Sequence, residues 1–436
     1  MHDDAEAIWT AAMRAVQPER LVAARLSLPG VGQAICHDDR PLDPPVQLDG
    51  VDRIVVVGAG KAAAGMAAGL EEMLGPDGLA RHLVRGLVSV PAGCGRRLTA
   101  VEVRETRPAS ANLPTPAVVE ATHEILAMVS DLGPRDLVIA VITGGGSALM
   151  AAPKEGISLE EKIAVTRRLS ESGADIATLN AARRDLSLVK GGGLARACTA
   201  GTLLVLVLSD VIGDDLDVIA SGPCMPSGPC LSAGPHSADG TWTTPTGCRV
   251  QHIIVGDNRT AAEAAGAAAK QRGYDVLDQP PTAPGIAAAN TAEAVGRRLA
   301  AAAIFLQAAT VHDNQPRAFI TGGEATVTVP ADHGVGGRNQ QTVVAAIDNF
   351  QHAGMPWPTG LLIASVGTDG EDGPTDAAGG YADARVLAEI TRLGIDVPGT
   401  LARCDAYRLL DAAGGLIRTG PTGTNVADIR IVLTRP

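Results

Sequence analysis

Residues 137–150, LVIAVITGGGSALM, limit what this chain can fold into more than any other stretch. An unbroken apolar run leads through Thr143 into Gly144, Gly145 and Gly146, and Ser147 follows directly. The apolar run predicts a buried parallel strand. The glycines permit a turn whose amides converge on an anion, with a helix beginning at Ser147. A tight strand-to-helix turn without a ligand is the alternative.

A second strand-to-helix turn is expected after residues 54–57, where Gly58 and Gly60 precede a helix that extends to about Leu74. The GxGxxA spacing is typical of nicotinamide-dinucleotide sites, but the next expected strand, 83–90, ends without an acidic residue for a ribose. Lys61 in this turn places a cation beside a helix N-terminus. Such a cation suits a transferring phosphoryl group or a substrate carboxylate. A solvated surface lysine is the alternative.

The composition favours closely packed α/β layers. The 436 residues are 46% hydrophobic but only 2% aromatic, and 51 of them are glycine, so helices can lie close to sheets. The length predicts two domains, 1–245 and 246–436, with the boundary near the end of a Pro- and Gly-rich segment, 222–248. A formal net charge of −12 argues against nucleic acid as a partner.

Seven scattered cysteines without CxxC spacing, and an N-terminus without a signal peptide, predict a reduced, cytoplasmic protein. No stretch offers the roughly 20 apolar residues of a membrane span, so no membrane association is expected. A zinc site formed by Cys224, Cys230, His236 and Cys248 is an alternative for the segment 222–248, although the spacing of these residues is irregular.

Carboxylates follow another expected strand, 203–208. Asp210, Asp214 and Asp215 come at its carboxyl end, where open α/β sheets bind their ligands. Aspartate oxygens are suitable ligands for Mg²⁺, and an aspartate can accept a hydroxyl proton. An Asp-rich turn that caps a helix at Ile219 is the alternative.

A helix is expected to carry polar residues at helical spacing before three further glycines, 191–193. This helix would present Asn180, Arg183, Ser187 and Lys190 on one face. An ordinary solvent-exposed face is the alternative. The glycines favour a binding face because they allow close backbone approach.

The second half of the chain is again expected to be α/β, beginning with a strand at 251–255. A strand at 317–321 leads to Glu324 and a β-rich run to 329. Arg338, followed by Asn339, stands at a glycine-rich helix start, where its guanidinium could bind a phosphate or carboxylate in bidentate fashion. An acidic turn that includes Asp369 could hold metal or brace a long loop.

Seven collinear segments together resemble the glycerate 2-kinase family, the two-domain type with a MOFRL domain. They are VVGAGKAAAGMA, ITGGGSALM, SGADIATLNAARRDLSLVKGGGLA, LSDVIGDDLDVIASGP, TGGEATVTV with GGRNQ, GTDGEDGPTDAAG and GPTGTNVAD. The resemblance implies a Rossmann-like N-terminal domain and a smaller mixed α/β C-terminal domain, with the active site in the cleft between them. It also implies transfer of the ATP γ-phosphoryl group to the 2-hydroxyl of D-glycerate with Mg²⁺.

By position, the resemblance makes Lys61, Asp210 and Arg338 the catalytic residues. We assign Lys61 and Arg338 to neutralising the transferring phosphate, and Asp210 to the metal or the attacking hydroxyl. Asp214 is expected to be a second metal ligand. The residues expected to bind substrate or phosphate are Gly58, Gly60, Gly144, Gly145, Gly146, Ser147, Arg183, Lys190, Glu324, Asn339 and Asp369. ATP and a small hydroxy acid are the expected partners, and a homodimer is left open.

The chain departs from the family pattern at several positions. Arg184-Asp185 replaces a Lys-His pair, Arg107-Pro-Ala-Ser110 replaces a His-Pro segment, Gln341 stands where Glu is common, and the segment 224–248 is short. These changes make the acceptor acid less certain than the reaction. Two alternatives stay open: an NAD(P)-dependent hydroxypyruvate or hydroxyacid reductase, and a non-catalytic relative that binds a ligand.

Overall fold

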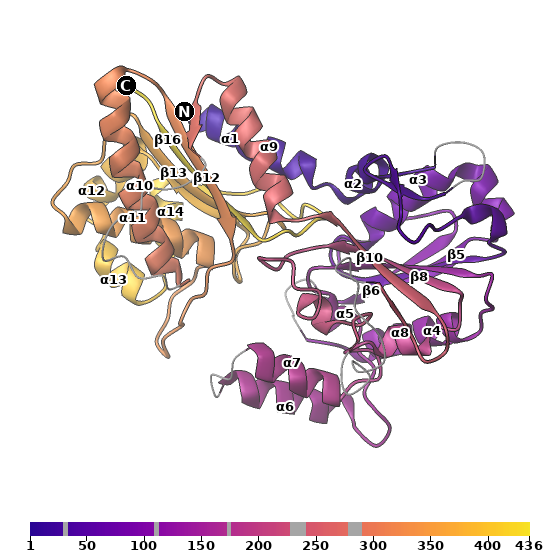
Figure 1. Ribbon diagram of the computed structural model, residues 1–436. Helices are drawn as coiled ribbons and strands as arrows, with labels where there is room; N and C mark the ends of the chain where they lie inside the picture. The colour runs from indigo at the N-terminus through magenta and orange to yellow at the C-terminus, as the bar shows by residue number, and fades with distance from the viewer. Residues whose placement is uncertain (29–33, 109–112, 172–175, 227–240, 278–289) are drawn as a thin grey trace. The chain divides into compact units, whose positions relative to one another are not determined.

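The computed structural model describes residues 1–28, 34–108, 113–171, 176–226, 241–277 and 290–436 (Figure 1). The chain forms two compact units. The seven-stranded unit contains Gln17–Asp257 and Gly423–Asn425. The six-stranded unit contains Met1–Val16, Asn258–Thr422 and Val426–Pro436. Each unit holds one main sheet with helices, which confirms the expected two-domain α/β class.

The main sheet of the seven-stranded unit has the order β6-β5-β4-β7-β8-β10-β9. All its strands are parallel except β9, which pairs antiparallel with β10. The order of the parallel strands is that of doubly wound nucleotide-binding sheets, and it reverses between β4 and β7. The strands are β4 (Ile54–Ala59), β5 (Arg85–Pro91), β6 (Val101–Arg107), β7 (Leu137–Thr143), β8 (Thr202–Leu208), β9 (Trp242–Thr243) and β10 (Arg249–Gly256).

Helices and a small antiparallel sheet complete this unit. The sheet consists of β1 (Leu26–Ser27), β2 (Cys36–His37) and β3 (Arg40–Pro41). The helices are α2 (Pro18–Arg25), α3 (Ala63–Arg81), α4 (Pro116–Ser130), α5 (Gly146–Leu149), α6 (Leu159–Glu171), α7 (Ile176–Asp185) and α8 (Gly193–Ala197), with short 3₁₀ turns at Leu48–Gly50 and Ile219–Ser221.

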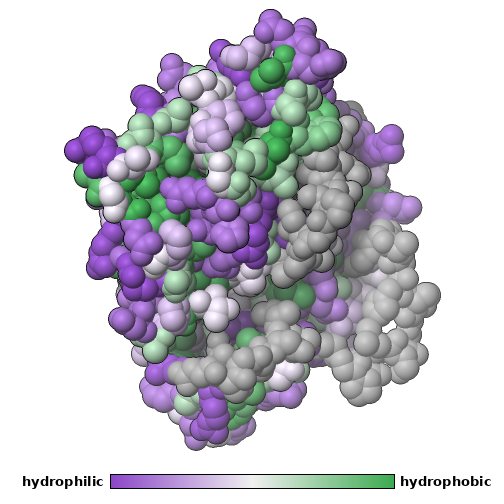
Figure 2. Space-filling model, turned by 90° about the vertical axis from the view of Figure 1, so that its left-hand side faces the viewer, coloured by the Kyte–Doolittle hydropathy of each residue, from purple (hydrophilic) through white to green (hydrophobic). Residues whose placement is uncertain are grey.

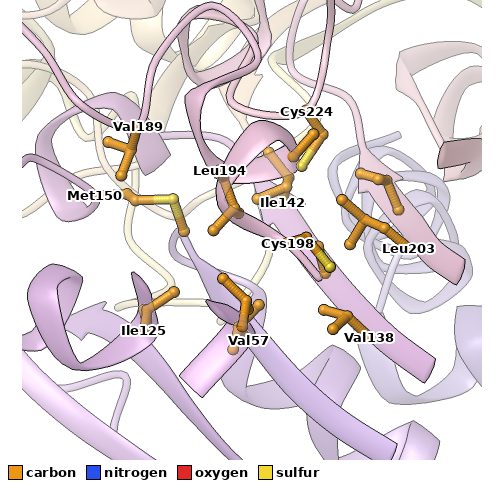
Figure 3. Close-up of a cluster of buried hydrophobic side chains, with 14 of the residues drawn as sticks. Val57, Ile125, Val138, Ile142, Met150, Val189, Leu194, Cys198, Leu203 and Cys224 are labelled. Carbon is orange, nitrogen blue, oxygen red and sulfur yellow. The ribbon is translucent and has the colours of Figure 1, made fainter. Parts of the chain in front are cut away.

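The core of the seven-stranded unit is built from fully buried strands. Side chains such as Val57, Val138 and Leu203 pack with Ile125 of α4 and Leu194 of α8 (Figure 3). Parallel strands covered on both faces need such continuous apolar runs. The runs read from the sequence at 54–57, 137–142 and 203–208 are therefore confirmed as core strands.

The six-stranded unit has a mostly antiparallel sheet, in the order β11-β12-β16-β13-β14-β15, with one parallel pair, β11 and β12. The strands are β11 (Asp275–Leu277), β12 (Arg317–Gly323), β13 (Leu361–Gly367), β14 (Gly379–Ala382), β15 (Leu416–Ile417) and β16 (Asp428–Thr434). The helices are α1 (His2–Ala15), α9 (Asn258–Gln271), α10 (Ala292–Asp313), α11 (Arg338–His352), α12 (Ala384–Leu393), α13 (Val397–Ala402) and α14 (Ala406–Ala413).

Contrary to the expectation that no stretch is long and apolar enough for a membrane span, helix α10 meets this condition by length and composition alone. Half of its most apolar window is buried within the structure, and the helix packs extensively on α11. Leu299, Ala303 and Leu306 of α10 belong to the apolar core of this unit.

On the face drawn in Figure 2, hydrophilic residues are interspersed with small apolar areas.

The compact units differ from the expected ranges 1–245 and 246–436. Residues 251–255 were expected to begin the second half, but β10 pairs with β8 and completes the first sheet. Pro18 stands at the first position of α2 and separates this helix from α1. As a result, α1 belongs to the six-stranded unit and α2 to the seven-stranded unit.

Two further expectations were wrong. Helix α7 ends at Asp185, so Ser187 and Lys190 do not share a helical face with Asn180 and Arg183. The expected β-rich run does not continue to residue 329. The strand β12 ends at Gly323, and between there and 329 only Thr326 forms an isolated bridge.

Candidate active site

Lys61 and the glycine triplet lie together where the strand order reverses. The β4–α3 turn carries Lys61, the β7–α5 turn carries Gly144–Gly146, and the amide of Lys61 donates a hydrogen bond to the carbonyl of Gly144 (3.1 Å). Open α/β sheets bind ligands at the carboxyl ends of strands at this point. The structure therefore brings two separately predicted elements to one place.

Gly145 lies next to two cationic side chains. Its φ of +77° is a left-handed conformation that favours glycine. A Cβ atom at Gly145 would lie 3.7 Å from Arg107 Nη2 and 3.9 Å from Lys61 Cγ. Arg107 is 5% exposed and Lys61 is partly buried, so two cationic groups are held near Gly145, with the Asp210 carboxylate at the neighbouring Gly144. This geometry suits an anionic group that approaches the backbone of Gly145.

Close packing against β7 requires glycine at positions 58 and 60, at the end of β4 and in the turn that follows it. A Cβ atom at Gly58 would lie 2.1 Å from the carbonyl oxygen of Val141, and one at Gly60 would lie 1.9 Å from Thr143 Oγ1. These positions let β4 and its turn lie directly against β7. Their presence is thus explained without a bound dinucleotide.

Asp210 reaches the same glycine turn from the end of β8. A Cβ atom at Gly144 would lie 2.4 Å from Asp210 Oδ2, and Asn425 Nδ2 donates to that oxygen at 3.4 Å. Asp214 lies further along the turn, with a φ of +56° and partial burial. Asn425 belongs to the motif GPTGTNVAD, but this motif does not indicate that Asn425 contacts Asp210. The two residues are far apart in the chain, so no spacing could have indicated the contact.

Ser147 is tied to Lys190 by direct hydrogen bonds. The Lys190 ammonium donates to Ser147 Oγ (2.8 Å) and to the Ser147 carbonyl (2.9 Å). Arg183 Nη1 donates to Asn180 Oδ1 (3.4 Å), and Asn180 Oδ1 accepts a hydrogen bond from Ser221 Oγ. These residues are brought together by different segments rather than by one helix face.

Arg338 is held by carboxylates of its own unit. Its Nη2 and Nε donate to Asp428, which is fully buried, and its Nη1 donates to Glu324 Oε1 (2.7 Å). Although burial lowers it, the Asp428 carboxylate raises the pKa of Arg338 above its ordinary value. The expectation that the guanidinium is open to bidentate binding of a phosphate must be revised, because Asp428 occupies that edge. Asp428 belongs to the motif GPTGTNVAD, which was its only signal in the sequence.

Asn339 and the acidic turn form a buried network at the start of α11. Asp372 Oδ1 and Oδ2 accept hydrogen bonds from the amides of Asn339 (3.0 Å) and Gln340 (2.8 Å), so they cap the helix. Burial raises the pKa of Asp372 to about 7, although these two hydrogen bonds lower it. Asn339 Nδ2 also donates to Asp428 Oδ1 (3.0 Å).

A cavity of about 630 Å³ opens beside this network in the six-stranded unit. Arg338 and Asp369 line it together with the apolar side chains of Val327 and Val329. The volume is in the range of small-molecule sites. The structure thus places Arg338, Glu324, Asn339 and Asp369 together in one unit, and Lys61, the glycines, Ser147, Lys190 and Asp210 in the other.

The cysteines offer no support for a zinc site. Cys224 and Cys248 are buried with Cys198 in the apolar core of Figure 3, and burial raises the pKa of Cys224, which keeps it a thiol. Cys230 and His236 lie outside the described residues. Among the described residues, no group of three or more His, Cys, Asp or Glu side chains is placed to hold a metal ion.

Two family models match the chain. The domain of unknown function DUF4147 matches residues 4–232, and the MOFRL family model matches residues 317–428. A D-glycerate 2-kinase of Thermotoga maritima is 33% identical over 91% of this chain and 94% of that protein. An Agrobacterium vitis protein with a provisional hydroxypyruvate reductase name is 36% identical over 87% of this chain and 99% of that protein.

Solved structures give the same relationship. The crystal structure of a glycerate kinase from Thermotoga maritima superposes with a TM-score of 0.76 at 31% identity, and the match covers 98% of this chain and 97% of that one. The similarity therefore extends over both units and both family models. The chain, which matches both the DUF4147 and the MOFRL family models, belongs to the glycerate 2-kinase family.

Proposed function

We propose that this protein is an ATP-dependent kinase that phosphorylates the 2-hydroxyl of D-glycerate, giving 2-phosphoglycerate and ADP. One observation carries the proposal beyond family membership: Lys61 and Arg107 flank Gly145 at the point where the strand order of the sheet reverses. Phosphoryl transfer depends mostly on positioning and on neutralising charge, and this turn offers both.

In the proposed reaction, the 2-hydroxyl oxygen of glycerate bonds to the γ-phosphorus while the bond from that phosphorus to the ADP oxygen breaks. Lys61 and Arg107 stabilise the negative charge on the transferred group, since both flank the backbone of Gly145. Asp210, whose carboxylate lies beside Gly144, would accept the hydroxyl proton or hold a metal ion.

The residues present fit Mg²⁺. Mg²⁺ in kinases is commonly held by one or two carboxylates together with substrate phosphates, so a three-acid cluster is not required. Asp210 at the end of β8, with Asp214 in the same loop, would be those carboxylates. The ion would supply neutralisation of the β- and γ-phosphate charge.

The contacts of Arg338 reduce its support as a neutraliser of phosphate. Its guanidinium already contacts two carboxylates, Asp428 and Glu324. We retain Arg338 and Asp369 in the proposal as residues that line the cavity of the six-stranded unit. A cytoplasmic location and a homodimeric state also belong to the proposal.

The test is incubation of the purified protein with ATP, Mg²⁺ and D-glycerate, followed by measurement of ADP. ADP formation that depends on both Mg²⁺ and D-glycerate is expected. A parallel reaction with NADH and hydroxypyruvate tests the reductase alternative, for which β5 offers no acidic residue at its end. Oxidation of NADH without any ADP formation in the first reaction would overturn the proposal.

A further inference from the structure

Three basic side chains gather in the seven-stranded unit beside the glycine turn. Lys162 comes from α6, Arg183 from α7, and Lys190 from the segment before α8; α6 and α7 form the helical pair seen in Figure 1. Lys162 is 4% exposed and Lys190 is 3% exposed. Lysine is almost never buried to this extent without a charged partner.

The protein partners of these three side chains are neutral. Lys162 Nζ donates to the carbonyl of Arg183 (3.4 Å), and Lys190 Nζ donates to Ser147 and to the carbonyl of Ala220. Arg183 Nη1 donates to the amide oxygen of Asn180. Within the described part of the chain, no carboxylate forms a hydrogen bond or ion pair with any of the three.

The cations also affect one another. Burial lowers the pKa of Lys190 well below its ordinary value, and the charges of Lys162 and Arg183 lower it further. Burial and Arg183 lower the pKa of Lys162 to about 8. Buried like charges without a counter-ion oppose folding, so a stabilising role in the unliganded protein does not explain the cluster.

A chain of hydrogen bonds links the cluster to the glycine turn. Asn180 Oδ1 accepts from Arg183 and from Ser221 Oγ, Ser221 Oγ lies 3.0 Å from Ser147 Oγ, and Ser147 Oγ accepts from Lys190. Ser147 directly follows Gly144–Gly146. An anion held by these cations would therefore lie next to the turn that we assign to the transferring phosphate.

We propose that Lys162, Arg183 and Lys190 bind a compact oxyanion of the substrates, and that Lys162 is a binding residue. The carboxylate of the hydroxy acid is the preferred source, because Lys61 and Arg107 already serve the phosphate at Gly145. A terminal phosphate of the donor offers the same chemistry. This inference rests on the proposed function for the identity of the ligand, but not for the existence of the anion site.

The experiment compares Lys162→Met with Lys154→Met, which alters an exposed lysine eight residues earlier in the same unit. Calorimetry measures binding of D-glycerate, inorganic phosphate and tripolyphosphate separately, without turnover. We expect Lys162→Met to weaken D-glycerate binding at least tenfold and to raise KM for D-glycerate more than it lowers kcat. We expect Lys154→Met to stay within twofold of wild type, and Lys162→Arg to recover part of the affinity.

Melting temperature supplies a second measurement. Because Lys162 is a buried cation without a counter-ion, Lys162→Met should melt at the same or a higher temperature than wild type without ligand. It should also lose most of the ligand-induced rise in melting temperature. If Lys162→Met does not fold, Arg183→Gln carries the same comparison.

Four results decide between these possibilities. Loss of phosphate and tripolyphosphate binding with unchanged D-glycerate binding would support the site and assign it to the donor. Unchanged binding of every anion with a lower melting temperature would overturn the proposal and make Lys162 a structural link to α7. Failure of the wild type to bind any of these anions would also overturn it. If wild type binds them and Lys162→Met does not, the site stands even where kinase activity is absent.

Discussion

Lys61 and Arg338 were both expected to neutralise phosphate, but their surroundings differ. The Lys61 side chain lies beside Gly145, and so does the guanidinium of Arg107. Arg338 forms ion pairs with Asp428 and Glu324, and Asp428 is fully buried. A cation with matched carboxylates adds little positive potential for a ligand. At the residue scale, the two ion pairs of Arg338 therefore reduce what it can contribute to the proposed phosphate chemistry.

Lys61→Ala should lower kcat about a hundredfold or more, which is roughly 3 kcal/mol of transition-state stabilisation. The melting temperature should change little, because the variant removes a charge from a turn and no core volume. Steady-state kinetics at saturating ATP and D-glycerate check this, with Lys154→Ala as the matched control. A Lys61→Ala enzyme with more than a third of wild-type kcat would contradict the role.

Asp210→Asn should reduce activity far more than Asp215→Asn. Asp210 lies against Gly144 at the end of β8, whereas Asp215 is exposed and its Oδ1 accepts a local bond from the amide of Asp217 (3.0 Å). The measurement is kcat over a Mg²⁺ titration for both variants. Equal losses in the two variants, or full activity in excess chelator, would indicate that the acidic loop is only structural.

Lys162 should make stability depend on pH in the unliganded protein. Its pKa is about 8 in the folded state, against an ordinary lysine value of 10.5, so between these pH values the unfolded chain binds more protons. The free energy of unfolding should therefore rise with pH from about 8 to about 10, by on the order of 2 kcal/mol. Arg183 and Lys190 face the same ammonium and do not offset its charge.

Urea unfolding of wild type and Lys162→Met at pH 7.5 and 9.5 isolates this contribution, because the titration of other groups cancels between the two proteins. The rise should be smaller in Lys162→Met. The same rise in both proteins would show that Lys162 is not the group responsible.

At the element scale, two kinds of glycine occupy the turns of the sheet. Gly58 and Gly60 are needed because a Cβ atom would meet β7. Gly145 has a left-handed φ, and its nearest neighbours at the Cβ position are the side chains of Arg107 and Lys61 at 3.7 Å or more. The first kind serves packing, and the second leaves space where a ligand could approach.

Gly145→Ala should lose activity out of proportion to its loss of stability. Gly156 has a similar φ of +80° with no atom near its Cβ position, so Gly156→Ala is a matched control for backbone strain. Each variant should lose about 1 kcal/mol of unfolding free energy. Only Gly145→Ala should lose most of its kcat; similar activity in the two variants would remove Gly145 from the site.

The main strands and the helices that follow the glycine turns were predictable from local patterns. Apolar runs at β4, β7 and β8 indicated the parallel core. At the start of α6, Ser158 and Glu161 form a capping box with reciprocal bonds of 2.8 and 3.1 Å. The end of α7 at Asp185 was missed, because polar spacing continued past it as far as Lys190.

Long-range contacts were not predictable in this way. Asp428 and Arg338 lie 90 residues apart, and Asn425 and Asp210 lie 215 apart, so no periodicity joins them. Lys162 was missed because it follows the acidic residues of a capping box, where a lysine normally faces solvent. Only the packing of α6 on α7 reveals its burial.

For the whole molecule, the departures from the family pattern have different structural consequences. Arg107 is buried beside Gly145, so it lies at the proposed phosphate-binding turn. Gln341 Nε2 donates to Glu293 Oε1 (2.9 Å), and a glutamate there would place two carboxylates together. Asp185 is exposed at the end of α7. Of these three, Arg107 is the departure that lies at the proposed phosphate site.

The position of the new phosphate in the product tests the central claim most directly. The protein is incubated with ATP, Mg²⁺ and D-glycerate, and the product is offered to enolase, which acts on 2-phosphoglycerate, with and without phosphoglycerate mutase. We predict that enolase alone converts the product, and that Lys61→Ala yields almost none. A product that enolase converts only after mutase is added, or no phosphorylated product from the wild type, would contradict phosphorylation of the 2-hydroxyl of D-glycerate.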